Sequence, residues 1–430
     1  MNRLFKNGEI YLNGQFVEKD FILDNSGIII FAEQMDVEDE MDEVIDCTGL
    51  TIMPGFVDTH VHLRSPGFEE KETIAAGTKA AAHGGYTAVF AMPNLNPVPD
   101  TLEHLAEEEK IIAKEAVIPV FPVCALTKDR NGKNGLSDIE ELSTHSYVFS
   151  DDGSGIEDAE LMKQAMERIK AVNGILSEHC EVQALVPEGA SLQEGKTAEK
   201  YGVPGIPSSS EYEEVIRDIA LAKETGCDFH VCHISAAESV EAVRQAKKEG
   251  LSVTCEVTPH HLLLSEDDIT ENDGRFKMNP PLRTEKDRLT LIEGIKDGTI
   301  DMIATDHAPH TAQEKNTDIL HAKMGVAGLE TAFAACYTGL VRTGAITLEK
   351  LVDLMSTKPA EVFGIEKGEI HNLAPADFCI FDLNRKYRVD PSQFLSKGRS
   401  TPFEGKMLQG VCVMTVSDGK IVYRGRNYEA

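Results

Sequence analysis

The sequence lacks tryptophan, has no CxxC pair and has no apolar run near the ~18 residues that a membrane-spanning helix needs. Its nine cysteines are odd in number and dispersed, which predicts reduced, mostly buried thiols rather than a disulfide framework. The first residues carry no long apolar signal segment. We therefore expect a cytoplasmic protein with no membrane span.

Positive charge is also scarce in this chain. There are 42 Lys and Arg residues against 72 Asp and Glu residues, which gives a formal net charge of −30. Such a surface repels nucleic-acid phosphates and anionic membranes, so neither is expected as a partner. The same charge disfavours a small anionic substrate at long range, so such a ligand would need a local cation in its pocket.

A glycine-rich phosphate cradle is missing too, because no GxGxxG or P-loop motif follows any apolar run. This absence disfavours a doubly wound open sheet. Instead, short apolar runs alternate with helical patterns over about 300 residues, which is typical of an α/β protein with a TIM (β/α)8 barrel. The expected strands are the run that leads into His60 and residues 88–91, 117–121, 147–149, 174–176, 229–232, 252–255 and 301–304. The clearest helical segments are residues 158–172, 210–225, 236–249 and 285–297.

The two ends of the chain have a different character from the middle. Asn7-Gly8 and Asn13-Gly14 are hairpin dipeptides between short apolar runs, and the C-terminal part is rich in β-branched runs. A chain of 430 residues fits one large domain plus a smaller one. We predict that residues 1–54 and 368–430 form one small sheet domain, and that residues 55–367 form the barrel.

Imidazole and carboxylate groups follow five of the eight expected strands, and TIM-barrel active sites lie at the C-terminal ends of the strands. His60 and His62 lie two positions apart, so an extended segment points both to one side. The other groups are at Asp151-Asp152, Glu178-His179, His233 and Asp306-His307. Nitrogen and oxygen ligands without thiolate favour zinc or manganese in a catalytic site, and more than four of them allow a two-metal site.

Eight motifs together resemble those of the dihydroorotases, and more narrowly of the bacterial class I enzymes of the amidohydrolase superfamily. They include His-Leu-Arg, Pro-Asn, Asn-Pro-Pro-Leu-Arg and Asp-His-Ala-Pro-His, a combination more specific than any one of them. The motifs are at residues 60–64, 92–94, 150–153, 178–181, 230–235, 256–261, 277–283 and 305–310. The resemblance covers nearly the whole chain and implies a TIM barrel with a small β-sandwich domain formed by both termini.

The resemblance implies a set of metal ligands. His60 and His62 would hold a first ion. Asp152 would ligate between two metals, and His179 and His233 would hold a second ion. The implied metal is Zn2+, with one or two ions per subunit. Related enzymes often bridge the metals with a carbamylated lysine, but the motif here has Asp152, so no such lysine is expected.

Asp306 is the implied general acid and base, and a further metal ligand. A carboxylate beside zinc stays ionised and can take a proton from metal-activated water, and the resulting hydroxide attacks the ring amide. Asp306 then hands the proton to the leaving nitrogen. The implied function is the reversible cyclisation of N-carbamoyl-L-aspartate to (S)-dihydroorotate and water, in de novo pyrimidine (UMP) biosynthesis.

The resemblance also implies how the substrate is held. Arg64, Asn94 and His310 would bind its free carboxylate, and the planar arginine fork supplies the local cation that an acidic protein needs. Asn279 would hydrogen-bond the ring. Further implied contacts are at His62, Leu63, Met324 and Gly325.

Several other polar residues are expected to support the site rather than to ligate. His230 points the opposite way from a strand-end ligand and is expected in the core or behind a ligand. His260 and His261 are expected behind the ligands, and His307 is expected to be structural because alternation sends it elsewhere. Asp151 is expected to orient its loop rather than to ligate, with an exchange of roles with Asp152 as the alternative.

Some positions depart from the family pattern and leave alternatives open. Ser65, Phe68, Leu95 and Met324 replace more usual residues, although none of these changes removes a ligand. One alternative is another cyclic-amide hydrolase, such as a hydantoinase or allantoinase, whose substrates do not present the same ring carboxylate. A second is a catalytically dead scaffold for aspartate carbamoyltransferase, which the retained ligands argue against. The resemblance implies a homodimer and allows association with aspartate carbamoyltransferase.

Overall fold

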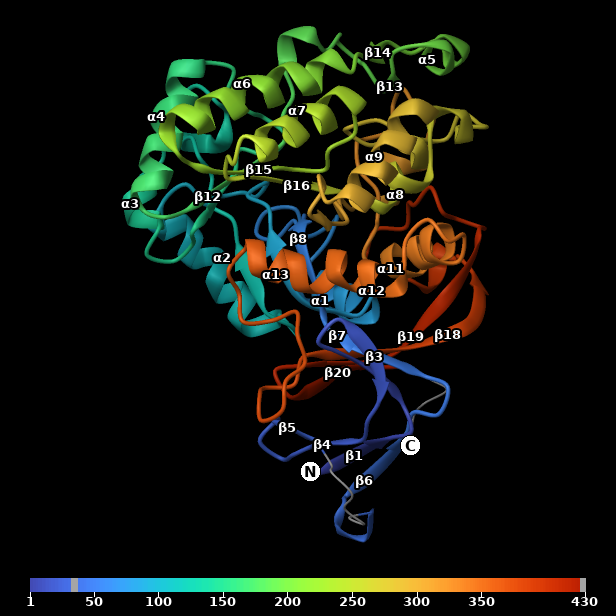
Figure 1. Ribbon diagram of the computed structural model, residues 1–430. Coiled ribbons are helices and arrows are strands. Elements are labelled where there is room, and N and C mark those ends of the chain that lie inside the picture. Colours follow the sequence, from blue (N-terminus) through green and yellow to red (C-terminus); the bar gives the residue numbers. More distant parts are fainter. Residues whose placement is uncertain (32–37, 426–430) are drawn as a thin grey trace.

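Eight parallel strands form a barrel in the structure, a computed structural model that describes residues 1–31 and 38–425 (Figure 1). The strands are β8 (Phe56–Val61), β9 (Tyr86–Ala91), β10 (Val120–Pro122), β11 (Val148–Phe149), β12 (Ile175–Glu178), β15 (Asp228–Val231), β16 (Val253–Val257) and β17 (Met302–Ile303). They pair in the orders β10-β9-β8 and β11-β12-β15-β16-β17. Parallel bridges Cys124↔Phe149 and Val61↔His307 join the two groups into a closed ring. The TIM-barrel prediction is confirmed.

Helices surround the barrel, so its strands are covered on both faces and read as continuous apolar runs. The larger helices are α1 (Ile74–His83), α2 (Leu102–Glu115), α4 (Ala159–Ala171), α6 (Ser209–Thr225), α7 (Ala237–Lys248) and α9 (Glu285–Asp297). The shorter ones are α3 (Ile139–Leu142), α5 (Lys196–Tyr201), α8 (Pro259–Leu263), α10 (Ala312–Lys315), α11 (Ala332–Cys336), α12 (Leu348–Val352) and α13 (Lys358–Val362). Two π-helical segments, Tyr337–Val341 and Asp353–Thr357, lie between the last of these.

Local sequence explains where these helices begin and end. Helix α9 starts with a capping box, in which the Thr284 side chain accepts from the Asp287 N–H and the Asp287 side chain accepts from the Thr284 N–H. It stops at Gly298, whose φ of +81° is a left-handed conformation that favours glycine. The side chain of Asp158 caps α4 in the same manner, by accepting from two N–H groups of its first turn.

Most of the remaining strands form two sheets from both ends of the chain, at the bottom of Figure 1 near the N-terminus. The first sheet contains β1 (Arg3–Lys6), β4 (Phe21–Leu23), β5 (Ile29–Phe31) and β6 (Glu43–Asp46). The second contains β2 (Glu9–Leu12), β3 (Gln15–Glu18), β7 (Thr51–Pro54), β18 (Phe378–Arg388), β19 (Met407–Ser417) and β20 (Lys420–Arg424). A further short parallel pair, β13 (Leu192–Gln193) and β14 (Gly205–Ile206), lies at the top of Figure 1.

Aromatic packing holds the two sheets together. Phe5 stacks on Phe21 at a ring distance of 4.9 Å, and Phe378 meets both rings edge-on at 5.3 Å. Strand β7 leads directly into barrel strand β8, and the Thr415 hydroxyl of β19 donates to the Ala82 carbonyl of α1. These contacts fix the sheets to the bottom of the barrel, away from the strand ends that carry the histidines.

None of the described helices is long and apolar enough to cross a membrane. The nine cysteines are all buried, and each is a free thiol. Residues 32–37 and 426–430, which belong to the predicted sheet domain, lie outside the described part of the chain.

Candidate active site

Four imidazoles and two carboxylates meet at the C-terminal ends of the barrel strands. All six are buried, with exposed fractions between 0 and 5%. They are His60 on β8, His62 just after β8, Asp152 after β11, His179 after β12, His233 after β15 and Asp306 after β17. The six come from five strands, and they meet because all parallel strands of a closed barrel end at one rim.

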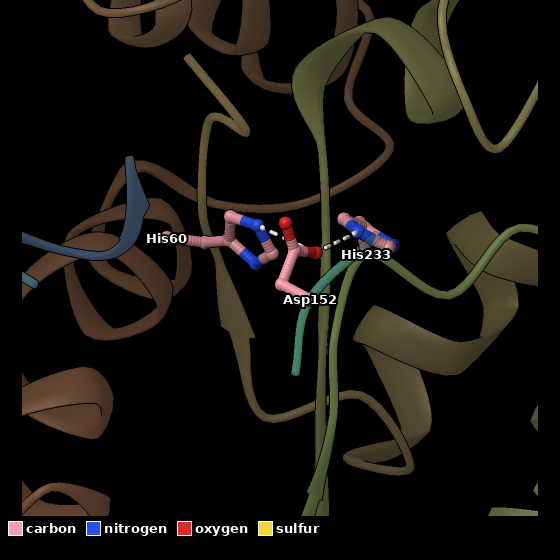
Figure 2. Close-up of side chains that lie close together, drawn as sticks. All are labelled: His60, Asp152 and His233. Carbon is pink, nitrogen blue, oxygen red and sulfur yellow. Dashed lines mark ion pairs between the residues drawn. The ribbon is translucent and has the colours of Figure 1, made fainter. Parts of the chain in front are cut away.

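Asp152 lies at the centre of this group, between His60 and His233 (Figure 2). Its Oδ1 is 3.5 Å from His60 Nε2, 3.7 Å from His233 Nε2 and 3.8 Å from His179 Nδ1. One carboxylate oxygen therefore faces three imidazole nitrogens. This is the arrangement expected of a ligand shared between two metal positions.

Asp306 contacts the two histidines of the first strand, His60 and His62. Its Oδ1 is 3.1 Å from His62 Nε2 and 3.7 Å from His60 Nε2. His60, His62 and Asp306 thus form one group whose ligand atoms all lie within 4.8 Å of one another, and His60, Asp152 and His233 form a second such group. The two groups share His60, so the donor set can serve one ion or two.

The state of the ring nitrogens fits a divalent ion. His60 Nε2, which faces both Asp152 and Asp306, is buried and has no hydrogen-bond partner within the described residues. Buried polar atoms are nearly always paired, and a bound ion is one accepted reason for an exception. Burial also lowers the pKa of His233 to about 4, which keeps its ring in the neutral form that ligates metals.

Glu256 holds His60 in the orientation that a metal ligand needs. His60 Nδ1 lies 3.0 Å from Glu256 Oε1, which leaves Nε2 facing Asp152. A carboxylate behind a ligating histidine fixes the ring tautomer and raises its basicity. Burial alone would raise the pKa of Glu256, but hydrogen bonds from His230 and His60 bring it below its usual value. Thr59 Oγ1 also donates to Glu256 Oε2, at 2.5 Å.

Several neighbours affect the protonation of Asp306. Burial is the main cause that raises the pKa of Asp306, to about 7. The charge of His60 lowers this pKa, and the negative charge of Asp152 raises it. A group with a pKa near the working pH suits general acid and base catalysis. Asp58 fixes the residue before Asp306. The Asp58 carboxylate accepts from the N–H of Thr305 at 3.1 Å and from the Thr305 hydroxyl at 2.6 Å.

Three residues of the site have left-handed backbone conformations. The φ angles are +61° at Arg64, +29° at His233 and +46° at Asp306, and none of these residues is glycine. Such conformations cost free energy in a side-chain-bearing residue and concentrate at functional sites.

Comparison with known proteins agrees with this geometry. A dihydro-orotase-like family model matches residues 49–239, and an amidohydrolase family model matches residues 295–423. The dihydroorotases of Bacillus cytotoxicus and Bacillus cereus are both 48% identical to this chain over 427 residues, which cover 99% of the chain and 99% of each relative. The chain belongs to the dihydroorotase family. The resemblance seen in its motifs is confirmed.

Solved structures place the dihydroorotase-family chain among related cyclic-amide hydrolases. An L-hydantoinase (dihydropyrimidinase) from Arthrobacter aurescens is 28% identical, has a TM-score of 0.86 and is matched over 98% of this chain and 96% of its own. A dihydropyrimidinase from Brevibacillus agri NCHU1002 is 25% identical, with a TM-score of 0.84 over 99% and 95% of the two chains. The barrel with its β-sandwich is thus the architecture of a hydrolase superfamily.

The residues expected at the substrate carboxylate lie beside the cluster of histidines and aspartates. Arg64 is half-buried, and its Nε donates to the Pro309 carbonyl at 3.3 Å. His310 Nε2 donates to the Met324 carbonyl at 2.7 Å. At Gly325, with φ of +130°, an added Cβ would lie 2.4 Å from the Ala308 carbonyl oxygen, so only glycine lets this segment approach so closely.

The two expected amide side chains also lie at this rim. Asn94 Nδ2 donates to the Asp152 carbonyl at 2.9 Å. Asn279 Nδ2 lies 3.1 Å from both carboxylate oxygens of Glu181 and 3.5 Å from His179 Nε2. The side chain of Leu63 is buried in the core, where it would contact any Cβ added at Gly77, so only its main chain can face a ligand.

The supporting polar residues lie behind the ligands. His230 Nε2 is 3.2 Å from Glu256 Oε2, and His261 Nε2 donates to the Pro280 carbonyl at 2.9 Å, just after Asn279. His260 is buried against His261. His307 turns away from the ligands and lies 3.4 Å from Glu72 Oε2.

Sequence reasoning gave no role to Glu256, Glu181 or Arg130. Glu256 opens one of the family motifs and ends the seventh apolar run, so its place at a strand end could have singled it out. Glu181 follows His179 by two residues, the spacing that had identified His60 and His62. Arg130 lies in a loop with no regular pattern, and no feature of the sequence distinguishes it.

Proposed function

We propose that this chain catalyses the reversible cyclisation of N-carbamoyl-L-aspartate to (S)-dihydroorotate and water, as its relatives' name implies. The observation that carries the proposal is the convergence of four histidines and two aspartates on one rim, with Arg64 and His310 beside them. The histidines and aspartates fit metal-dependent hydrolysis, and the arginine fits a substrate with a free carboxylate.

His60, His62 and Asp306 would hold a first ion, and Asp152, His179 and His233 would complete the site for a second. Zinc is the proposed metal because the donors are imidazole and carboxylate without thiolate. A divalent ion bound here would lower the pKa of water and polarise the ring carbonyl. With Asp152 between the two groups, no carbamylated lysine is needed.

The protein's own residues then control the protons and the orientation of the ring. Asp306 would take the proton of the attacking water on its carboxylate and pass it to the ring nitrogen as the amide bond breaks. In the direction of ring closure, the ureido nitrogen bonds to the carbon of the protonated carboxyl group and gives an N–H proton to the Asp306 carboxylate, and Asp306 passes that proton to the departing hydroxyl, which leaves as water. The buried hydrogen bonds of Asp58 and Thr305 keep Asp306 in place during both steps.

Substrate recognition would come from the side of the rim that carries Arg64. Arg64, Asn94 and His310 would bind the free carboxylate, and the Asn279 amide would bind the ring. Main-chain groups near Met324 and Gly325, and near His62 and Leu63, would complete the pocket. Ser65 and Phe68 lie in the loop after Arg64, where they would affect its packing rather than the chemistry.

Further proposals concern the assembly. We propose a cytoplasmic homodimer that can associate with aspartate carbamoyltransferase. The proposed domains are residues 1–54 with 368–430 and residues 55–367, a division that the pairing of β7 with β18 supports. Size-exclusion chromatography with light scattering, alone and with aspartate carbamoyltransferase added, tests both assembly proposals.

The experiment that tests the function compares substrates on the zinc-loaded enzyme. We expect ring closure of N-carbamoyl-L-aspartate and hydrolysis of dihydroorotate, and a far slower turnover of hydantoin. Removal of zinc by a chelator should abolish the activity. The Asp306→Asn variant should lose activity by a factor of about 10²–10⁴. Asp267→Asn, an exposed carboxylate on the surface, is the matched control and should be unchanged. A fully active Asp306→Asn enzyme would show that another group moves the proton.

A further inference from the structure

The loop after β10 is tied to the strand end that carries Asp152. Asp151 is fully buried, and its carboxylate accepts from the N–H of Leu126 at 2.9 Å and of Thr127 at 3.1 Å. The Thr127 hydroxyl in turn accepts from the N–H of Gly132 at 2.9 Å. Residues 126–132 are therefore held against the rim of the barrel, and a side chain on this loop keeps a fixed place near the site.

Arg130 is the residue that this loop directs at the rim. Its Nη1 donates to the Asp152 carbonyl and, at 2.8 Å, to the Ser154 hydroxyl. Asn94, one of the groups expected at the substrate carboxylate, donates to the same Asp152 carbonyl. The φ angle of Arg130 is +48°, an uncommon conformation for a bulky residue that is often found at functional sites. Arg130 and Asn94 thus lie side by side.

Both side chains have buried atoms that the protein does not pair. Arg130 Nε and Asn94 Oδ1 are buried and have no hydrogen-bond partner within residues 1–31 and 38–425. Leaving a buried donor of a charged group without a hydrogen-bond partner costs free energy. Gly153, with φ of +75°, faces the same place, because a Cβ there would lie 3.5 Å from Asn94 Nδ2 and 3.8 Å from Arg130 Nη1. A side chain at position 153 would therefore contact both Asn94 and Arg130.

Charge points to an anion as that ligand. The positive charge of Arg130 reaches Arg64, and the carboxylates of Asp306, Asp152 and Glu314 also lie close enough to Arg64 to affect it. Two guanidinium groups close enough to affect each other repel unless an anion lies between them. Metal ions on Asp152 and Asp306 would take up the negative charge of those two carboxylates, and Glu314 is paired with Lys71 at 2.9 Å, so an anion between the two guanidinium groups would come from the substrate.

We propose that Arg130 is a second arginine for the substrate carboxylate, acting with Arg64 and Asn94, and that it selects carboxylate-bearing rings over uncharged cyclic amides. The proposal rests on the proposed function, since it names a further residue for the same substrate. It gives the loop after β10 a part in specificity that the metal ligands cannot supply, because they meet the same ring amide in every substrate of this kind.

The test measures KM and kcat for dihydroorotate and for dihydrouracil, the same ring without the carboxylate. Arg130→Met should raise KM for dihydroorotate by roughly tenfold or more, as expected for the loss of a charge-assisted hydrogen bond, with little change in kcat. Arg130→Lys keeps the charge and should show a smaller rise. Lys128→Met removes an exposed cation from the same loop and should match the wild type. Any turnover of dihydrouracil should be equal in all four proteins.

Bound zinc is measured in each protein, because Arg130 also contacts the Asp152 carbonyl. An Arg130→Met enzyme with unchanged KM overturns the proposal, and a loss of zinc and kcat at unchanged KM would mean that Arg130 only holds Asp152. If the first variant does not fold, Arg130→Lys answers the question through its KM. Should the wild type leave dihydroorotate unchanged, the proposed function fails, and calorimetry with dihydroorotate and dihydrouracil on the same proteins then tests Arg130 by itself.

Discussion

Replacing Glu256 by Gln should weaken metal binding without changing any ligand. The substitution keeps the shape of the side chain but removes the negative charge 3.0 Å from His60 Nδ1. His60 then loses the partner that fixes its tautomer, and its Nε2 becomes a poorer donor to the metal. The effect is expected at His60 first, because this histidine belongs to both of the candidate groups that contain an aspartate.

The size of the effect follows from the kind of hydrogen bond that changes. A hydrogen bond to a charged group contributes about 1.5–3 kcal/mol and a neutral one about 0.5–1.5 kcal/mol, so the variant should lose roughly 1–2 kcal/mol of metal affinity. That loss is a factor of roughly 5–30 in Kd. The lower end applies if the new amide is still able to accept from His60. The upper end applies if the amide turns to His230, which lies 3.2 Å from the other carboxylate oxygen.

Competition with a chromophoric zinc chelator measures this Kd directly. Glu108→Gln is the matched control, because Glu108 is 1% exposed and lies on α2, and neither of its carboxylate oxygens has a partner among the described residues. Burial raises the pKa of Glu108 well above its usual value, so an amide there replaces a neutral acid and zinc affinity should not change. A Glu256→Gln protein that binds zinc as tightly as the wild type would refute the role given to Glu256.

Three more changes test other parts of the structure. Thr305→Val removes the hydroxyl that donates to buried Asp58, and should cost about 1–3 kcal/mol of unfolding free energy and lower kcat, as measured by urea unfolding and initial rates. Phe378→Ala empties the β-sandwich core and should cost about 3–5 kcal/mol in the same unfolding experiment, while kcat of the folded fraction stays unchanged. Burial lowers the pKa of Lys315 from 10.5 to about 7. At pH values between these two, the unfolded chain therefore holds a proton on Lys315 that the folded chain does not. The unfolding free energy should therefore rise by up to about 1.4 kcal/mol per pH unit from pH 7 upward, and a Lys315→Met protein should lack this rise.

The barrel could be predicted because its pattern is local. The helices expected at residues 158–172 and 285–297 are found at Ala159–Ala171 and Glu285–Asp297. The third strand differed more, since residues 117–121 were expected and Val120–Pro122 was found. Pro119 has no N–H to give to the ladder, and its carbonyl alone pairs, with Val89. The pattern of apolar residues from which the strand was predicted takes no account of this missing N–H.

The site could be predicted in part, for a related reason. Period-2 alternation places His60 and His62 on one side of a strand, and the barrel rule brings distant strand ends together. Neither rule says which side chain lies opposite His60 across the barrel. The contact with Glu256 depends on the stagger between β8 and β16, which are not neighbours in the sheet. Arg130 depends in the same manner on a loop whose course is set by Asp151.

The charge at the substrate end explains why two arginines would be needed in so acidic a protein. Lys71 is paired with Glu314 at 2.9 Å, so it adds little net charge. Burial lowers the pKa of His310 to about 4, helped by the charges of Arg64 and Lys71, so the imidazole is neutral at pH 7 and can only offer a dipole. Interactions beyond a Debye length of about 8 Å are screened, so the net charge of −30 acts weakly inside the pocket and the nearest groups decide. Among the described residues beside Asp152 and Asp306, Arg64 and Arg130 are left as the cations that can meet an anion, and selection of a carboxylate-bearing ring would depend on them.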